Sequence, residues 1–239
     1  PDVSGASRVS GALARGLLSP RQCIQAAEDQ IQRPIWEFPD NAFSWINELI
    51  WRDFYQHLLV GFPRLSKNQA FRTETEALAW RNLPEEIDAW KAGRTGIPIV
   101  DAGMRELKAT GWMHNRVRMI VAQFLTKNLL CDWRIGEAHF MQFLVDSDLG
   151  ANNGGWQWSA STGTDAAPYF RVFNPVSQSE THDPQANYIS HWIPELLTIP
   201  VKKRHAPWSG SIPQGYTAPI VDLKTSRQRA IDAFKDLKS

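Results

Sequence analysis

Apolar residues recur three and four positions apart along most of this chain, which is the spacing of one buried helix face. Ser19 and Pro20 carry the side-chain cap and first-turn proline of a helix start, and Gly61 is placed to end a helix. The clearest stripe, in the segment 41–60, consists of Trp45, Ile46, Leu49, Ile50, Phe54 and Leu58. We predict helices over about 20–32, 41–60, 84–93, 98–111, 114–130 and 135–145, from Asp183 and Pro184 onward, and over about 222–238.

Strict alternation of apolar and polar residues, the pattern of a half-buried strand, is nearly absent. We find no βαβ unit, internal repeat or low-complexity segment, and the proline-rich stretch 199–219 is expected to be irregular. The pattern therefore predicts an all-α fold in which residues 1–239 form one domain with long functional loops.

Composition narrows the class of protein. The chain has 239 residues, of which 43% are hydrophobic, and this is enough for a sizeable buried core. Its 26 Lys and Arg nearly balance 25 Asp and Glu, so a site for a polyanion must be a local patch. The strongest deviation is the 11 tryptophans, which indicate aromatic chemistry, stacking or both.

Cysteines and targeting signals bear on the compartment. Cys23 and Cys131 lie far apart and have no partners at metal spacing, which fits a reducing compartment. The chain has no signal peptide and no apolar run near the roughly 18 residues of a membrane span. We expect a cytoplasmic protein that does not enter a membrane. The chain starts without Met in a loop-like stretch, and we expect its natural N-terminal part to be missing.

Standard catalytic and metal motifs are not found. The stretch 146–152, DSDLGAN, resembles a calcium loop, but Gly150 occupies a ligand position and Ala151 replaces the turn glycine. The sequence contains no P-loop, GxGxxG or HExxH motif, and its six histidines show no metal-ligand spacing. We expect no metal site.

Three segments combine polar, charged and aromatic residues. In the helix 44–57, Glu48, Trp51, Arg52 and Tyr55 share one face, which is either a surface ion pair beside an aromatic ring or a grip for a base and a phosphate. The segment 110–133 begins with Asn115, Arg116, Arg118 and Met119, either a polar helix start or a phosphate site. The segment 143–175 holds Asp146, Asp148, Asn152, Trp156 and Trp158, and we interpret it as a loop that lines a pocket.

These segments resemble a known family. NELIWRDFY, GWMHNRVRM and DLGANNGGWQWSASTGTDAAPYFRVFNP are similar to the flavin-binding domain of the DNA photolyase and cryptochrome family, and most similar to the class I cyclobutane pyrimidine dimer photolyases. The resemblance runs from about Ser4 to the C-terminal end. It implies an all-helical domain that holds FAD in a bent, U-shaped conformation. The family's N-terminal α/β antenna domain is not in this chain, and an antenna chromophore is expected there.

The resemblance also implies a cofactor site. SGASRVSG, residues 4–11, matches the phosphate-binding loop of the family, with Ala6 where Thr is usual. Asp146 would pair with Arg118, Asp148 would lie near the polar edge of the flavin, and Asn152 would face the flavin N5 without adding a charge. The implied cofactor-binding residues are Ala6, Ser7, Arg8, Val9, Ser10, Trp45, Arg52, Trp112, Asn115, Arg118, Asp146, Asp148 and Asn152.

The residues with catalytic roles in the family have counterparts here. Trp156 would stack near the flavin as the first relay of an electron chain that runs through Trp133 to Trp80 at the surface. Glu48 would hydrogen-bond the base edge of the lesion and stabilise its radical anion. With Asn152, these residues form the implied catalytic set.

The implied partner is DNA that contains a cyclobutane pyrimidine dimer, bound by a monomer. Trp158 would face away from the flavin and clamp the flipped-out dimer against Trp51, since aromatic walls recover lost base stacking. The implied DNA-binding residues are Glu48, Trp51, Tyr55, Asn115, Arg116, Met119, Trp158, Arg171 and Gln178.

Three functions compete. In the first, a repair enzyme, fully reduced FAD (FADH⁻) absorbs blue or near-UV light and gives the dimer an electron, which splits it into two pyrimidines. The second is a cryptochrome-like blue-light sensor without repair activity, and the third is a helical nucleic-acid-binding module without flavin. Met119 stands where the (6–4) photolyase branch has His, and Asn152 is photolyase-like, so the resemblance favours dimer repair.

Overall fold

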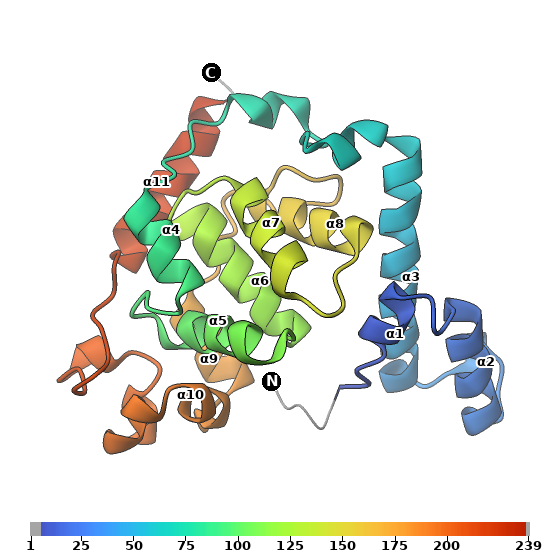
Figure 1. Ribbon diagram of the computed structural model, residues 1–239, viewed down its shortest axis with the longest axis horizontal. Coiled ribbons are helices and arrows are strands. Elements are labelled where there is room, and N and C mark those ends of the chain that lie inside the picture. Colours follow the sequence, from blue (N-terminus) through green and yellow to red (C-terminus); the bar gives the residue numbers. More distant parts are fainter. Residues whose placement is uncertain (1–5, 238–239) are drawn as a thin grey trace.

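The computed structural model describes residues 6–237, and all regular structure in this range is helical (Figure 1). The α-helices are α1 (Ser10–Ala14), α2 (Pro20–Ile31), α3 (Asp40–Gly61), α4 (Pro84–Lys91), α5 (Pro98–Thr110), α6 (Asn115–Gln123), α7 (Trp133–Phe143), α8 (Leu149–Ala160), α9 (Pro175–His182), α10 (Asn187–Trp192) and α11 (Leu223–Asp236). A π-helical turn, Phe124–Asn128, continues α6. Short 3₁₀ turns lie at Ile35–Glu37, Pro63–Lys67, Thr73–Ala77, Pro194–Thr198, Val201–Lys203 and Pro207–Ser209.

The all-α prediction is confirmed, and several helix ends follow the predicted chemistry. Ser19 caps α2 in a capping box with Gln22, and Pro20 is its first residue. Gly111 ends α5 in the left-handed region at φ 68°, where glycine has no steric penalty. Ser4 and Gly5 of the predicted phosphate loop, and Lys238 of the last predicted helix, lie outside the described residues.

One predicted helix end holds for a different physical reason, and one predicted helix start is wrong. Gly61 is the last residue of α3 rather than a left-handed cap; the helix ends because Pro63 restricts the residue before it, and Phe62 has φ −132°. Asp183 does not begin a helix. Its carboxylate instead accepts the backbone N–H groups of Tyr188 and Ile189, both at 3.1 Å, and so stabilises the start of α10.

The interpretation of 143–175 as one loop is also wrong, because α8 crosses it. Asp148 caps this helix by accepting from the Ala151 N–H at 2.9 Å. Two glycines and two asparagines make its isolated helix propensity poor. Packing overrides that propensity: a methyl group at Gly154 would lie 2.1 Å from the Tyr55 ring, so the glycine lets α3 approach α8 closely.

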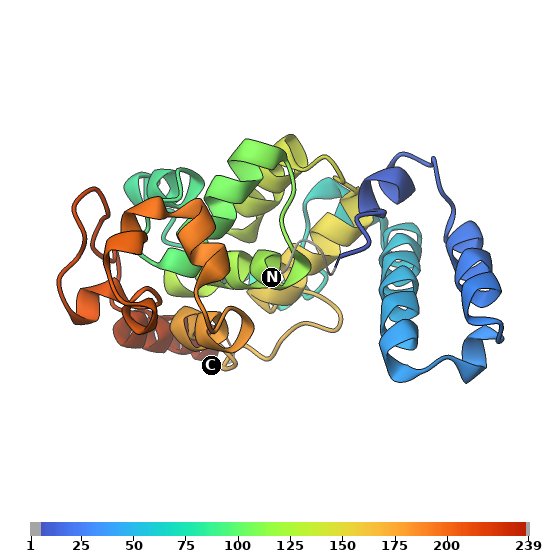
Figure 2. The same ribbon diagram turned by 90° about the horizontal axis from the view of Figure 1, so that it is seen from below.

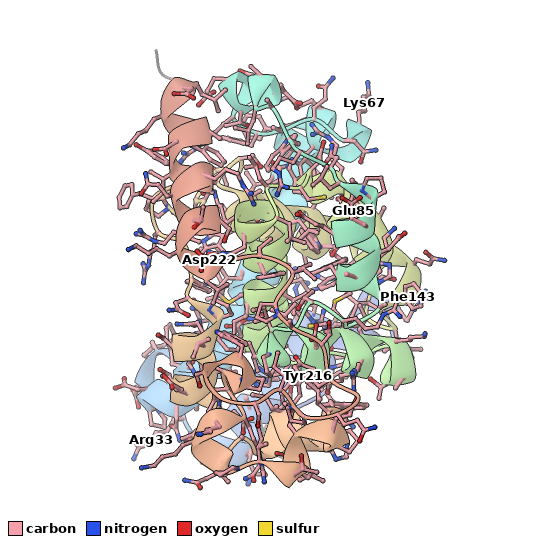
Figure 3. All side chains as sticks on the ribbon, turned by 90° about the vertical axis from the view of Figure 1, so that its left-hand side faces the viewer. Arg33, Lys67, Glu85, Phe143, Tyr216 and Asp222 are labelled. Carbon is pink, nitrogen blue, oxygen red and sulfur yellow. The ribbon has the colours of Figure 1, made fainter. Side chains whose placement is uncertain are left out.

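Sequence patterns also missed α1, α9 and the turn that interrupts 114–130. Pro175 begins α9, and Asn174 caps it by accepting from the N–H of Val176 at 3.0 Å. The stretch 199–219 is irregular apart from two single turns, as predicted. Its Tyr216, labelled in Figure 3, donates its hydroxyl to Asp101 Oδ2 at 2.7 Å and ties the segment to α5.

Two apolar cores stabilise the fold. The larger lies among α4–α8 and α10, with α11 packed along the π-helical turn. The smaller is formed by Leu13, Cys23, Ile46 and Leu49, where α1 and α2 pack on α3. Figure 2 shows these first three helices standing at one end of the molecule, and α3 also packs against α8. Ile50, predicted to belong to the buried stripe, is 50% exposed.

Candidate cofactor and substrate site

A cavity of about 630 Å³ lies between the 6–14 segment, α3, the start of α6 and the turn before α8. A smaller one of about 160 Å³ adjoins it, and the two share Asn115, Arg118, Met119, Asp146, Asp148 and Ala151. Twelve of the thirteen predicted cofactor residues line the larger cavity, and the thirteenth, Asn152, lines the smaller. The fold therefore brings the whole predicted set together from four stretches of the chain, 6–10, 45–52, 112–118 and 146–152.

Carboxylates and guanidinia are paired at the floor of the cavity. Arg118 Nη2 contacts Asp146 at 2.8 Å, as predicted, and its Nε donates to the Met113 carbonyl at 2.7 Å. Arg52 lies 3.8 Å from Asp148, which also accepts from the Gln56 amide at 2.8 Å. In the described residues Arg52 makes no ion pair with Glu48, so the predicted Glu48–Arg52 surface pair does not form; the second ionic contact of Arg52 is with exposed Asp53 on the same helix, at 3.9 Å.

The 6–10 segment closes one side of the cavity. The Trp45 indole donates to Ser7 Oγ at 3.1 Å, which ties this segment to α3. Arg8 adopts φ 55° and places its guanidinium 4.8 Å from the centre of the Trp112 ring. A left-handed conformation is unusual for an arginine, and here it turns the side chain across the cavity toward the segment before α6.

Asn152 and Gly155, both on α8, line the smaller cavity. The Asn152 amide donates to the Glu137 carbonyl at 3.0 Å, so its Oδ1 is turned the other way, and no donor in residues 6–237 reaches that oxygen. A methyl group at Gly155 would meet nothing within 4 Å and would project into the smaller cavity. An acceptor without a partner and a glycine that faces empty space both indicate room for a bound group.

The donor set fits a flavin dinucleotide. Guanidinia from Arg8, Arg52 and Arg118 and the hydroxyls of Ser7 and Ser10 suit a pyrophosphate. The indoles of the cavity wall suit planar rings, and the free Asn152 oxygen suits a ring N–H. Ala6 supplies no hydroxyl to this set.

Four of the predicted DNA-binding residues line the same cavity as the predicted cofactor residues. Glu48, Asn115, Arg116 and Met119 all line the larger cavity. Desolvation by the surrounding protein raises the pKa of Glu48 and so favours its protonated carboxyl, which is the form that can donate a hydrogen bond. His114 caps α6 by accepting the Arg116 N–H at its Nδ1, 3.1 Å away, and burial, followed by nearby positive charges, lowers its pKa.

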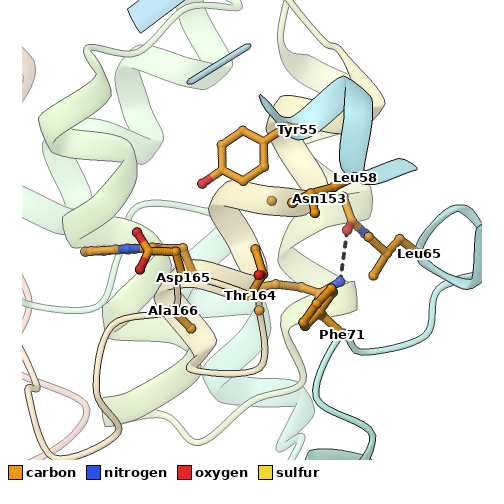
Figure 4. A pocket seen from close by; sticks show the side chains of 12 residues that line it. Tyr55, Leu58, Leu65, Phe71, Asn153, Thr164, Asp165 and Ala166 are labelled. Carbon is orange, nitrogen blue, oxygen red and sulfur yellow. Dashed lines mark hydrogen bonds between the residues drawn. The ribbon is translucent and has the colours of Figure 1, made fainter. Parts of the chain in front are cut away.

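A separate small pocket lies on the other side of α8 (Figure 4). Tyr55 and Trp158 line it, and the Tyr55 hydroxyl points toward the side on which Asp165 lies. Burial, with the charge of Asp165 second, raises the pKa of Tyr55 to about 12. Trp51 packs against Tyr55 with ring centres 6.0 Å apart. The volume of about 20 Å³ holds no more than a water molecule.

Comparison with known proteins identifies the family. A model of the FAD binding domain of DNA photolyase matches residues 45–236. The chain belongs to this family. A deoxyribodipyrimidine photo-lyase of Salmonella typhimurium is 51% identical over an alignment of 239 positions that covers 98% of this chain and 50% of that protein.

Solved structures agree with this assignment. A class III photolyase from Agrobacterium tumefaciens superposes with a TM-score of 0.90 at 40% identity, over 98% of this chain and 50% of that one. A cryptochrome from Synechocystis superposes with a TM-score of 0.86 at 36% identity, over 95% and 48%. The chain thus spans about half the length of the relatives it matches, and FAD is the cofactor of this family.

The tryptophans of this photolyase-family domain occupy distinct environments. Trp156 is buried, lines the smaller cavity, and lies over Gly136, where a methyl group would be 2.1 Å from its ring. Trp133 is fully buried in the larger core, and Trp80 is partly buried against that core. Of the three tryptophans of the predicted relay, Trp133 and Trp156 are buried, and Trp80 is the most exposed.

Five of the nine predicted DNA contacts do not line the two joined cavities, namely Trp51, Tyr55, Trp158, Arg171 and Gln178. Arg171 is exposed in the turn after Pro168, and Gln178 lies in α9. The Gln178 Oε1 is buried without a hydrogen-bond partner in the described residues. Sequence reasoning missed Met113 and His114, which line the cavity, and Gln56, which holds Asp148. The spacing of Gln56 four residues after Arg52 on the same helix face was the available signal.

No helix in residues 6–237 is long and apolar enough to cross a membrane. The same residues contain no group of three or more His, Cys, Asp or Glu side chains that could hold a metal ion.

Proposed function

We propose that this chain is the FAD-binding and lesion-binding part of an enzyme that repairs cyclobutane pyrimidine dimers in DNA with light. One observation carries the proposal: Glu48, Asn115 and Met119 line the same cavity as the cofactor residues. A lesion bound by them would lie beside the cofactor. The relatives of the chain are named deoxyribodipyrimidine photo-lyase, which supports the same reaction.

The cofactor would be held in two ways. Ser7, Arg8 and Ser10 would take the pyrophosphate through hydroxyl, guanidinium and backbone N–H groups, and Arg52 would add a second cation. Trp45 and Trp112 would flank the planar rings. The Asp146–Arg118 pair would remain intact beneath them, because the geometry satisfies both ions without the cofactor.

Reduced FAD, when bound and excited by light, supplies the electron that splits the cyclobutane ring and receives it back. The protein supplies orientation and electrostatics. Asn152 Oδ1 would accept a hydrogen bond from the flavin N5–H without adding charge, because Glu137 holds its amide in the required orientation. Trp156 would be the first relay of the reducing chain through Trp133 to Trp80.

The lesion would enter from the open side of the cavity. Glu48, with its raised pKa, would donate to a base carbonyl, and Asn115 and Met119 would pack beside it. Trp51 and Trp158 would stack on the flipped-out bases, and Tyr55 would support Trp51 from beneath. Arg116, Arg171 and Gln178 would contact phosphates around the lesion, so binding should weaken with salt.

The fold itself does not separate repair from sensing, since a photolyase and a cryptochrome superpose on it with similar scores. The five residues that favour repair are Glu48, Trp51, Met119, Asn152 and Trp158. A sensor needs the cofactor and the relay, but it needs no clamp or base-edge group, so the residues proposed to bind the lesion decide between the two functions.

The deciding experiment is repair of a single-stranded oligonucleotide that carries one thymine dimer, with reduced, FAD-loaded protein under blue light and a dark control. We expect repair in the light alone. Glu48→Ala and Trp51→Ala should weaken repair, and Glu48→Gln should retain more of it than Glu48→Ala because an amide can still donate. A yellow protein that photoreduces normally but repairs nothing would instead be a sensor.

A further inference from the structure

Lys127 is an unusual residue in this fold. Its side chain is 0% exposed, and it forms no ion pair with a carboxylate of the described residues. Burial lowers its pKa well below the usual range. An amino group without an ionic partner is costly to bury, so its surroundings must compensate.

Three contacts compensate for that burial. The Lys127 amino group donates to the Ala160 carbonyl at 3.0 Å and to Ser161 Oγ at 2.7 Å, and it lies 3.9 Å from the centre of the Phe234 ring. Ala160 is the last residue of α8, where unpaired carbonyls carry partial negative charge. The amino group therefore acts as a cap for the helix that holds the cofactor-facing and lesion-facing tryptophans.

The same contacts extend to the segment after α8. The Ser161 hydroxyl accepts a hydrogen bond from the Lys127 amino group and donates one to the Ala167 carbonyl at 2.6 Å. The Ala167 N–H in turn donates to the Trp158 carbonyl at 3.1 Å. Lys127 is thus two hydrogen bonds away from the backbone of Ala167, which is itself bonded to Trp158.

The π-helical turn explains how Lys127 reaches this place. In an uninterrupted α-helix, each residue is rotated about the axis by the same angle from the residue before it. The wider π-helical turn Phe124–Asn128 holds one extra residue, so its side chains point in directions that a continued α6 would not give them. All five residues of the turn are buried. Such turns are rare and recur at functional sites, which is a reason to ask what this one positions.

We infer that Lys127 is a positioning residue for the DNA-facing side of α8. Its amino group holds Trp158 and the chain toward Arg171 in place through Ala160, Ser161 and Ala167. The cofactor-facing side depends instead on the α7 contacts of Asn152 and Trp156. The inference rests on the proposed function, because it assigns Lys127 to recognition of the lesion.

The test is a double-mutant cycle on the full, FAD-loaded chain. Lys127→Met and Ser161→Ala are each made alone and together with Trp158→Ala, and Lys108→Met, the same change at an exposed lysine, is the control. The dissociation constant for the dimer-containing oligonucleotide is measured, together with the flavin absorption spectrum and the rate of photoreduction. Ser161→Ala keeps the test open if Lys127→Met does not fold.

We expect Lys127→Met and Ser161→Ala each to weaken oligonucleotide binding roughly tenfold, with flavin spectrum and photoreduction unchanged. Neither should weaken binding further in the Trp158→Ala background, because the effect acts through that indole. Equal losses in both backgrounds, or loss of flavin together with binding, would overturn the inference. If the unmodified chain does not bind the dimer-containing oligonucleotide, the proposed function fails, and the inference about Lys127 fails with it. The dissociation constant of the unmodified chain shows this before any variant is compared.

Discussion

The Asn152 side-chain amide donates to the Glu137 backbone carbonyl at 3.0 Å, and this single bond decides which end of the amide faces the cavity. The next residue repeats the link, since Asn153 donates to the Glu137 carboxylate at 2.8 Å. Two adjacent amides on α8 are therefore held by one residue of α7. The orientation of the Asn152 amide is therefore set by protein contacts alone.

Replacing Asn152 by Asp tests that arrangement. A carboxylate cannot donate to the Glu137 carbonyl and would repel it, so we expect Asn152→Asp to lose about 1–3 kcal/mol of unfolding free energy. The reduction potential of bound FAD should fall, because added negative charge disfavours the reduced anion. Denaturant unfolding and redox titration measure the two effects. Ser147→Asp adds a charge to the same cavity and should lose less stability; equal losses would contradict the role of the bond.

The neighbouring glycines of α8 should respond in opposite ways. Gly154→Ala drives a methyl group into the Tyr55 ring and should destabilise the fold by about 1–3 kcal/mol. Gly155→Ala meets no protein atom within 4 Å and should gain up to about 1 kcal/mol from helix propensity. Its methyl group enters the smaller cavity, so FAD occupancy should fall. Thermal unfolding without FAD measures the two stability changes, and the flavin content after loading measures FAD occupancy. Full flavin content in Gly155→Ala would contradict the expected loss of occupancy.

The Arg118–Asp146 pair should matter more than a surface pair. The Asp146 side chain is 5% exposed, so Arg118→Met leaves a buried carboxylate unpaired and should cost about 3–5 kcal/mol. The comparison variant is Arg105→Met, whose more exposed pair with Glu195 at 2.9 Å should be worth about 1 kcal/mol or less. Urea unfolding of both proteins gives the difference. A similar loss of unfolding free energy in the two variants would mean that water solvates the Asp146 carboxylate.

Burial of His139 should make the stability of the fold sensitive to acid. Burial between Trp90 and Phe143 lowers its pKa to about 4, whereas an unfolded histidine titrates near about 6.5. Between these values the unfolded chain binds the proton and the folded chain does not. The stability contribution of neutral His139 is thus complete above about pH 6.5 and is lost as the pH falls toward 4. His139→Gln should flatten this part of the stability profile, measured by denaturant unfolding at several pH values. An unchanged slope would assign the proton uptake elsewhere.

Local signals accounted for most helices and failed where several tertiary contacts compete with them. Ser19 and Gly111 behave as their residue types predict, because caps act over one turn of the chain. The stretch ANNGGWQW was interpreted as a loop, because two glycines and two amides are poor helix formers. Tyr55 packing on Gly154 and Asp148 capping the first turn stabilise the helix, and neither contact is visible in a local pattern.

Resemblance placed the candidate site more completely than periodicity did. Long collinear motifs indicated all thirteen cofactor residues, and all thirteen line the two joined cavities. Periodicity alone left Glu48 and Arg52 as either a surface ion pair or a binding face. One ionic partner of Arg52 is Asp148, almost a hundred positions away, and only the packing of α3 on α8 brings the two together.

By itself, the sequence determined the helical class and most helix positions, because propensity and capping are properties of neighbouring residues. The candidate cofactor residues followed from the resemblance of its long motifs to a known family. The tertiary structure decided which end of the Asn152 amide faces the cavity, why Gly154 and Gly155 differ, and where Lys127 finds its acceptors. Each depends on atoms that distant helices bring within hydrogen-bonding or van der Waals distance. Such distances are set by the packing of the whole fold, and no local stretch of the chain contains them.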